Sequence, residues 1–153
     1  MIETIIEDED WRQVLPDASA LAKACQTAAA AREPSLLGEI ALMLCNDAAM
    51  TDLNYRFRGK NKPTNVLSFP ADEAGEFLGD IALARETCQR EAAEKGIALR
   101  DHAAHLIIHG MLHLMGYDHQ AEEEAAVMER RETEILADMK IADPYSDGLS
   151  DSD

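Results

Sequence analysis

All five histidines of this 153-residue chain lie between His102 and His119. Three of them follow the spacing H-x-x-x-H-x-x-G-x-x-H, as His109, His113 and His119. Two histidines one helical turn apart present their imidazole nitrogens to the same point, as ligands of one metal ion must. Gly116 permits the left-handed backbone conformation that ends a helix, so His119 can return as a third ligand. The pattern therefore predicts a metal site made of these three histidines.

Three protein ligands leave the fourth position of a tetrahedral ion open. This arrangement is typical of catalytic zinc, because a structural site would normally recruit a fourth side chain, and none of the three cysteines is nearby in sequence. Zinc is the first expectation from three imidazoles, although nickel, cobalt and iron also accept them. His102 and His105 precede the motif on the same helical stripe, and we expect them to pack in the core or to support the ligands.

The histidine spacing is also that of metzincin-type zinc peptidases, whose general base is a glutamate directly after the first histidine. Here that position is Gly110. Without the carboxylate, peptide hydrolysis by that route loses a factor of ~10² to 10⁴, so a zinc peptidase is the least favoured interpretation. A metal ion with an open position can instead polarise a phosphoryl oxygen and lower the pKa of a bound water, while a nearby arginine stabilises the charge that develops in phosphoryl transfer.

The cations that such chemistry needs are concentrated in one segment. Residues 55–65, YRFRGKNKPTN, include Arg56, Arg58, Lys60 and Lys62 and no acidic residue. The chain as a whole has a net charge of −16, which argues against indiscriminate binding of polyanions. Any contact with nucleic acid is therefore expected to be local, and no DNA partner is expected. The alternative for this segment is a helix C-terminus followed by a solvated loop, since the helix dipole favours cations there.

Hydrophobic patterning predicts the elements that must position these residues. We expect Asp47 to be the N-cap, and Gly59 the stop signal, of the helix that precedes the basic segment. Strands mostly alternate with helices, so we expect an α+β fold (α/β layered): a small mixed β-sheet packed with about five helices, with the metal site at the end of a long central helix. The expected strands are 2–6, 38–46, 64–69 and 78–84, and the expected helices are 17–31, 47–58, 85–95, 99–115 and 121–140.

Length and composition predict one domain over residues 1–142, with 143–153 as a disordered acidic tail. No apolar run approaches the ~20 residues that a membrane span needs, so no membrane partner is expected. The N-terminal segment is acidic where a secretory signal would be basic. Three widely spaced cysteines, Cys25, Cys45 and Cys88, fit reduced thiols better than a disulfide framework. We therefore expect a cytoplasmic protein.

The motifs taken together resemble a known family. The segment HGMLHLMGYDH is preceded by FRGKNKPTNVLSF and LGDIAL and followed by ERRETEIL. These segments, in this order, resemble the YbeY family of bacterial metal-dependent endoribonucleases, which take part in ribosomal RNA maturation. The likeness runs from about Leu53 to Leu136. It implies that His109, His113 and His119 hold one zinc ion, and that Arg58 matches the arginine needed for activity.

The resemblance further implies a hydrolase that cleaves phosphodiester bonds of single-stranded RNA by metal-assisted chemistry with arginine stabilisation. It implies processing of the 3′ end of the small-subunit ribosomal RNA, a part in ribosome quality control, and a ribosome or ribosomal protein as a possible partner. The basic segment and the motif beside it are then expected to bind RNA through Lys60, Lys62, Asn65 and Ser68. Asp80 is expected to orient a ligand or Arg58 from behind the site.

Each of these assignments has an alternative. Lys60 and Lys62 can be solvated loop residues, Asn65 and Ser68 can hold the loop backbone, and Asp80 can be a hydrogen-bond acceptor at a strand end. The chain as a whole can be a non-catalytic ribosome-assembly factor whose metal ion stabilises the fold. The two interpretations differ in one test: an enzyme should cleave RNA and lose this activity when Arg58 is replaced, whereas an assembly factor should not cleave RNA.

Overall fold

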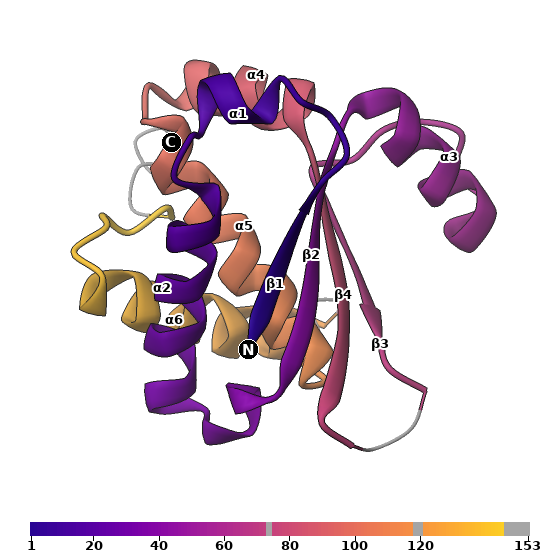
Figure 1. Cartoon of the computed structure of the whole chain (residues 1–153). Coiled ribbons are helices and arrows are strands. Elements are labelled where there is room, and N and C mark those ends of the chain that lie inside the picture. Colours follow the sequence, from indigo (N-terminus) through magenta and orange to yellow (C-terminus); the bar gives the residue numbers. More distant parts are fainter. Residues whose placement is uncertain (73–74, 118–120, 146–153) are drawn as a thin grey trace.

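A four-stranded mixed sheet forms the centre of the molecule (Figure 1). The structure is a computed structural model, and it describes residues 1–72, 75–117 and 121–145. The strand order is β1-β2-β4-β3, with β1, β2 and β4 parallel and β3 antiparallel to β4. The strands are β1 (Ile2–Ile6), β2 (Glu39–Cys45), β3 (Val66–Pro70) and β4 (Phe77–Ala84). The predicted small mixed sheet is confirmed.

Helices cover the two faces of the sheet unequally. Figure 1 shows α2, α5 and α6 together on one side, while α3 projects on the other. Alternate residues of β4 follow this division, because Ile81 and Leu83 join the large core and Ala82 and Ala84 join a smaller cluster with Met50 of α3. The helices are α1 (Trp11–Val14), α2 (Ala18–Arg32), α3 (Asp47–Arg58), α4 (Arg85–Lys95), α5 (Leu99–Leu114) and α6 (Glu122–Asp138), with a 3₁₀ helix at Pro34–Leu37.

The central helix α5 is buried along most of its length, as its apolar sequence predicts. It packs against α2, α4, α6 and the strands β3 and β4. It lies close to the sheet at Gly110, where an added Cβ would be 2.9 Å from Ile81 Cγ2 and 3.1 Å from Ser68 Oγ. This contact brings the C-terminal half of α5, with two motif histidines, against β3. The helix ends as predicted before Gly116, whose φ is +102°.

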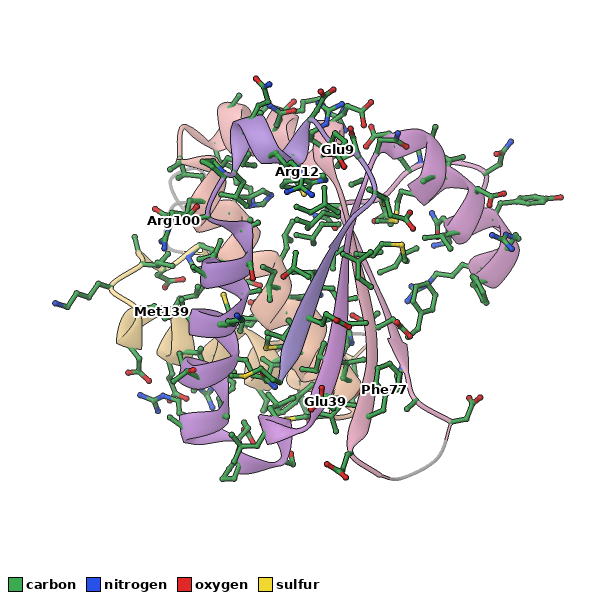
Figure 2. All side chains as sticks on the ribbon, in the orientation of Figure 1. Glu9, Arg12, Glu39, Phe77, Arg100 and Met139 are labelled. Atoms are coloured by element: carbon green, nitrogen blue, oxygen red, sulfur yellow. The ribbon has the colours of Figure 1, made fainter. Side chains whose placement is uncertain are left out.

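Charged side chains surround this core, as Glu9, Arg12 and Glu39 illustrate (Figure 2). One predicted detail of the elements is wrong. The N-cap of α3 is Asn46, whose extended backbone lets its side chain accept a hydrogen bond from the Ala49 amide at 2.8 Å. Among the described residues no helix is both long and apolar enough to cross a membrane.

Candidate metal centre

A cleft of about 510 Å³ lies between the end of α3, the loop after it, β3, α4 and α5. The predicted catalytic arginine, the four predicted RNA-contacting residues and two of the predicted metal ligands line it together. They are Arg58, Lys60, Lys62, Asn65, Ser68, His109 and His113. Segments that are more than 40 residues apart in the sequence therefore meet at one surface. The arrangement puts cations beside the imidazole pair, as the proposed phosphoryl chemistry requires.

The two motif histidines in the described part of the chain face each other. Their Nε2 atoms are 3.1 Å apart. The Nδ1 of His113 lies 2.9 Å from the carbonyl oxygen of Tyr117, and the Nδ1 of His109 lies 2.6 Å from Glu132 Oε2. Since a carbonyl and a carboxylate only accept hydrogen bonds, both Nδ1 atoms are the protonated donors. When both imidazoles are neutral, as metal ligands are, their lone pairs are therefore on the two Nε2 atoms, which lie close together.

This donor set fits a divalent metal ion. Two nitrogens that bind one tetrahedral zinc at ~2.0–2.1 Å lie roughly 3.3 Å apart, close to the separation of the two Nε2 atoms. His119, the third predicted ligand, lies outside the described residues. Its ligand role therefore stays a prediction, together with the complete three-histidine site.

A second group that could hold a metal ion shares one of these histidines. His105, His109 and Glu132 each offer a ligand atom, and these atoms lie within 4.8 Å of one another. However, the 2.6 Å between His109 Nδ1 and Glu132 Oε2 is a hydrogen-bond distance, shorter than the ~3.3 Å expected between two ligands of one ion. Glu132 is also completely buried. The geometry favours a hydrogen-bonded group behind the histidine pair over a second metal site.

The hydrogen bonds keep Glu132 ionised. Burial alone would raise its pKa, but hydrogen bonds from His105 and His109 outweigh burial and lower the pKa to about 2. The His105 Nε2 atom is 3.0 Å from Glu132 Oε1, and the hydroxyl group of Tyr145 donates to the same oxygen. Tyr145 belongs to the segment expected to be a disordered tail, of which residues 146–153 lie outside the described residues.

Most arginines outside the cleft are already paired with carboxylates. Arg56 forms an ion pair with Asp52 at 3.0 Å, and Arg85 with Asp8 at 2.7 Å. Within the described part of the chain, no carboxylate lies at ion-pair distance from the four cations that line the cleft. These are Arg58, Lys60, Lys62 and Arg90. Glu91 is the one carboxylate among the described residues that line the cleft, so the cleft has an excess of positive charge in an acidic molecule.

Several predicted residues also have structural contacts. The amide of Asn65 donates to Glu91 at 3.0 Å, and Ser68 donates to the backbone oxygen of Gly110 at 3.3 Å. Asp80 is paired with Phe69 in the sheet, is not among the described residues that line the cleft, and has a pKa raised by burial. The orienting role of Asp80 stays a prediction.

Comparison with known proteins identifies the family. A family model described as Endoribonuclease YbeY matches residues 4–140. The chain belongs to the YbeY family. It is 51% identical over 154 residues to the endoribonuclease YbeY of Rhodospirillum rubrum, covering 90% of this chain and 77% of the relative. It is 43% identical over 164 residues to that of Cereibacter sphaeroides, covering 95% of this chain and 98% of the relative.

The fold also matches the solution structure of TM1509 from Thermotoga maritima, with a TM-score of 0.58 and 23% identity over 100% of this chain and 97% of the other. The resemblance drawn from the motifs is thus confirmed, and the predicted class of enzyme, an endoribonuclease, is confirmed as that of the YbeY family.

Sequence reasoning missed three residues of this YbeY-family site. Asn54 is buried, and its amide donates to the carbonyl oxygen of Lys62 at 2.9 Å, so it holds the basic loop. Arg90 brings a fourth cation from α4, and nothing in its local sequence marks it. Glu132 could have been identified from the sequence, because it shares one face of α6, the buried one, with Met128 and Ile135. A carboxylate on an apolar helical stripe needs partners inside the fold.

Proposed function

We propose that this chain is a metal-dependent endoribonuclease that cleaves single-stranded RNA, and that it acts in maturation of the small-subunit ribosomal RNA 3′ end and in ribosome quality control. The observation that supports this function best is the shared cleft, in which Arg58 and the basic loop line the same surface as His109 and His113. The RNA substrate is proposed from the endoribonuclease activity named for the family, and the ribosomal RNA target and a ribosomal partner are proposed from the motif resemblance.

In this proposal His109, His113 and His119 hold one divalent ion, with zinc expected and nickel an alternative. Such an ion would polarise a phosphoryl oxygen and lower the pKa of a bound water. The Arg58 guanidinium stabilises negative charge that develops on the phosphate. Lys60 and Lys62 hold neighbouring phosphates, while the acidic remainder of the surface limits indiscriminate RNA binding.

The close packing at Gly110 argues against the peptidase alternative. A glutamate general base at this position would have to fit beside Ile81 and Ser68, where a single added Cβ would already lie 2.9 Å from Ile81 Cγ2. The position that carries the base in metzincins therefore faces the sheet in this chain. A phosphodiester substrate uses the cations on the open side of the histidine pair instead.

The first test is cleavage of a labelled single-stranded RNA by protein of measured metal content. We expect Arg58→Ala to lower the cleavage rate by ~10² to 10³-fold while metal content and RNA binding remain, because one charge-stabilising donor is lost. Arg56→Ala is the matched control, since Arg56 is two residues away and pairs with Asp52. It should cleave like the wild type.

His113→Ala, prepared identically, should lose both metal and cleavage. Equal cleavage by the wild type, Arg58→Ala and His113→Ala would reveal a contaminating nuclease. That result would contradict catalysis by this chain and favour the non-catalytic assembly factor.

A further inference from the structure

Glu132 is a buried carboxylate that joins three elements behind the histidine pair. It lies on α6 and is 0% exposed. Its Oε2 atom accepts a hydrogen bond from His109 Nδ1 at 2.6 Å. Its Oε1 atom faces His105 Nε2 at 3.0 Å and accepts from the Tyr145 hydroxyl. Both oxygens of one carboxylate are thus used by donors from α5 and from the segment after α6.

An ionised carboxylate without water is stable only where such donors surround it. The hydrogen bond from His109 has a consequence beyond the stability of Glu132, because it decides which ring nitrogen carries the proton. With Nδ1 protonated and held, the Nε2 lone pair of His109 points to His113 Nε2, 3.1 Å away. A rotation of the His109 ring, or a shift of its proton to Nε2, would remove that lone pair from the site.

The segment after α6 reinforces this arrangement. Asp143 Oδ1 accepts from the Tyr145 amide at 2.8 Å and from Thr133 Oγ1 at 3.3 Å, so the segment is folded back onto α6. The Tyr145 hydroxyl lies 3.1 Å from His105 Nε2 as well as on Glu132. Tyr145, the last residue that the structure describes, therefore contacts the hydrogen-bonded group behind the candidate metal centre.

We propose that Glu132 is a positioning residue that fixes the tautomer and the orientation of the metal ligand His109, and that Tyr145 holds Glu132 in place. This inference rests on the proposed function, in which His109 and His113 bind the metal. Carboxylates that accept from metal-bound histidines typically contribute tenfold to a hundredfold to metal affinity. The segment from the end of α6 to Tyr145 then belongs to the metal centre and is required for its full affinity.

The test is zinc affinity of the full chain, stripped of metal and titrated with zinc against a chelating indicator at fixed pH. Glu132→Gln keeps the size of the side chain but offers one acceptor oxygen where the carboxylate offers two. We expect it to bind zinc ~10 to 100-fold more weakly. Tyr145→Phe removes one hydroxyl and should weaken binding less. Glu129→Gln makes the same charge change at an exposed position of α6 and should leave the affinity unchanged.

A second readout separates positioning from a purely structural role. Nitrogen chemical shifts of His109 in the metal-free protein should show a protonated Nδ1 in the wild type and a mixture of tautomers in Glu132→Gln. Circular dichroism checks that each variant is folded. If Glu132→Gln does not fold, the same two measurements are made on Tyr145→Phe, which changes only the edge of the hydrogen-bonded group around Glu132.

The outcomes distinguish this inference from the proposed function. Wild-type affinity in both Glu132→Gln and Tyr145→Phe, with loss of zinc in His113→Ala, overturns the positioning role and leaves the metal site standing. Wild-type affinity in His113→Ala overturns the proposed metal site itself. Loss of all zinc in Glu132→Gln together with retention in His113→Ala would place the ion among His105, His109 and Glu132, and would overturn both.

Discussion

Four histidines, from His102 to His113, form a row along α5. The two ends of this row differ in which ring nitrogen is hydrogen-bonded to a carboxylate or carbonyl group. At the N-terminal end His102 and His105 are buried, and each directs its Nε2 atom to a carboxylate. His102 is 2.8 Å from Glu91 Oε1, and His105 is 3.0 Å from Glu132 Oε1. Their Nδ1 atoms are buried and have no hydrogen-bond partner in the described part of the chain.

At the C-terminal end the anchored nitrogen is the other one. His109 and His113 are partly exposed to the cleft, and their Nδ1 atoms are held by Glu132 and by the Tyr117 carbonyl. Their Nε2 atoms converge at 3.1 Å. One residue type at one helical spacing thus gives a scaffold at one end and a candidate metal site at the other. Burial and the nitrogen that is anchored decide between the two.

The largest effect that tests this comparison is on metal binding. His113→Ala removes a converging Nε2 and should weaken zinc binding by more than the ~10 to 100-fold expected for a positioning residue, with RNA cleavage reduced to background. His102→Gln, at the buried end, should keep the zinc affinity of the wild type. Zinc titration of both variants checks the contrast. Equal losses would mean that the whole row acts as one unit.

For the free energy of unfolding we expect the opposite order, with the larger loss at the buried end of the row. His102→Ala deletes a buried ring and removes one of the two donors to Glu91, leaving the Asn65 amide, so the free energy of unfolding should fall by about 2 to 3 kcal/mol. His113→Ala, at the partly exposed end, should change it by less than about 1 kcal/mol. Urea unfolding of the metal-free proteins measures both values. A larger loss in His113→Ala would show that the cleft end also supports the fold.

Much of this contrast could be anticipated from the sequence, because its signals are local. Helical spacing predicts the row, Gly116 predicts the end of α5, and the apolar residues between the histidines predict burial. The cations of the basic segment are adjacent in sequence, so their loop could be predicted too. The strands could be predicted from short runs of apolar and strand-forming residues, within a few positions of their observed ends.

The partners of the histidines could not be predicted, because they come from distant segments. Glu91 lies on α4 and Glu132 on α6, and only the packing of these helices against α5 brings them to the rings. The predicted N-cap of α3 was wrong for a similar reason. The Asp47 side chain accepts from the amide and hydroxyl of Thr87 at 3.1 and 2.9 Å, so a tertiary contact takes the group that local reasoning assigned to the cap.

The smallest expected effect is the dependence of stability on pH at the buried end. Burial lowers the pKa of His102 in the folded protein, and this outweighs the hydrogen bond from its ring to Glu91. In the unfolded chain the pKa is near the ordinary ~6.5. As the pH falls below that value the unfolded state takes up a proton before the folded state does, so the free energy of unfolding decreases.

His102→Gln has no titrating ring and keeps an amide that can donate to Glu91. Its free energy of unfolding should therefore fall less than that of the wild type between pH 7.5 and pH 5.5, by a difference smaller than the effect of His102→Ala. Urea unfolding of the two metal-free proteins across this range measures the difference, with Glu129→Gln as a control that should follow the wild type. Parallel curves for His102→Gln and the wild type would show that His102 takes up its proton equally in both states. The carboxylate of Glu91 would then offset burial, and the buried end of the row would differ from the cleft end in its contacts but not in its charge.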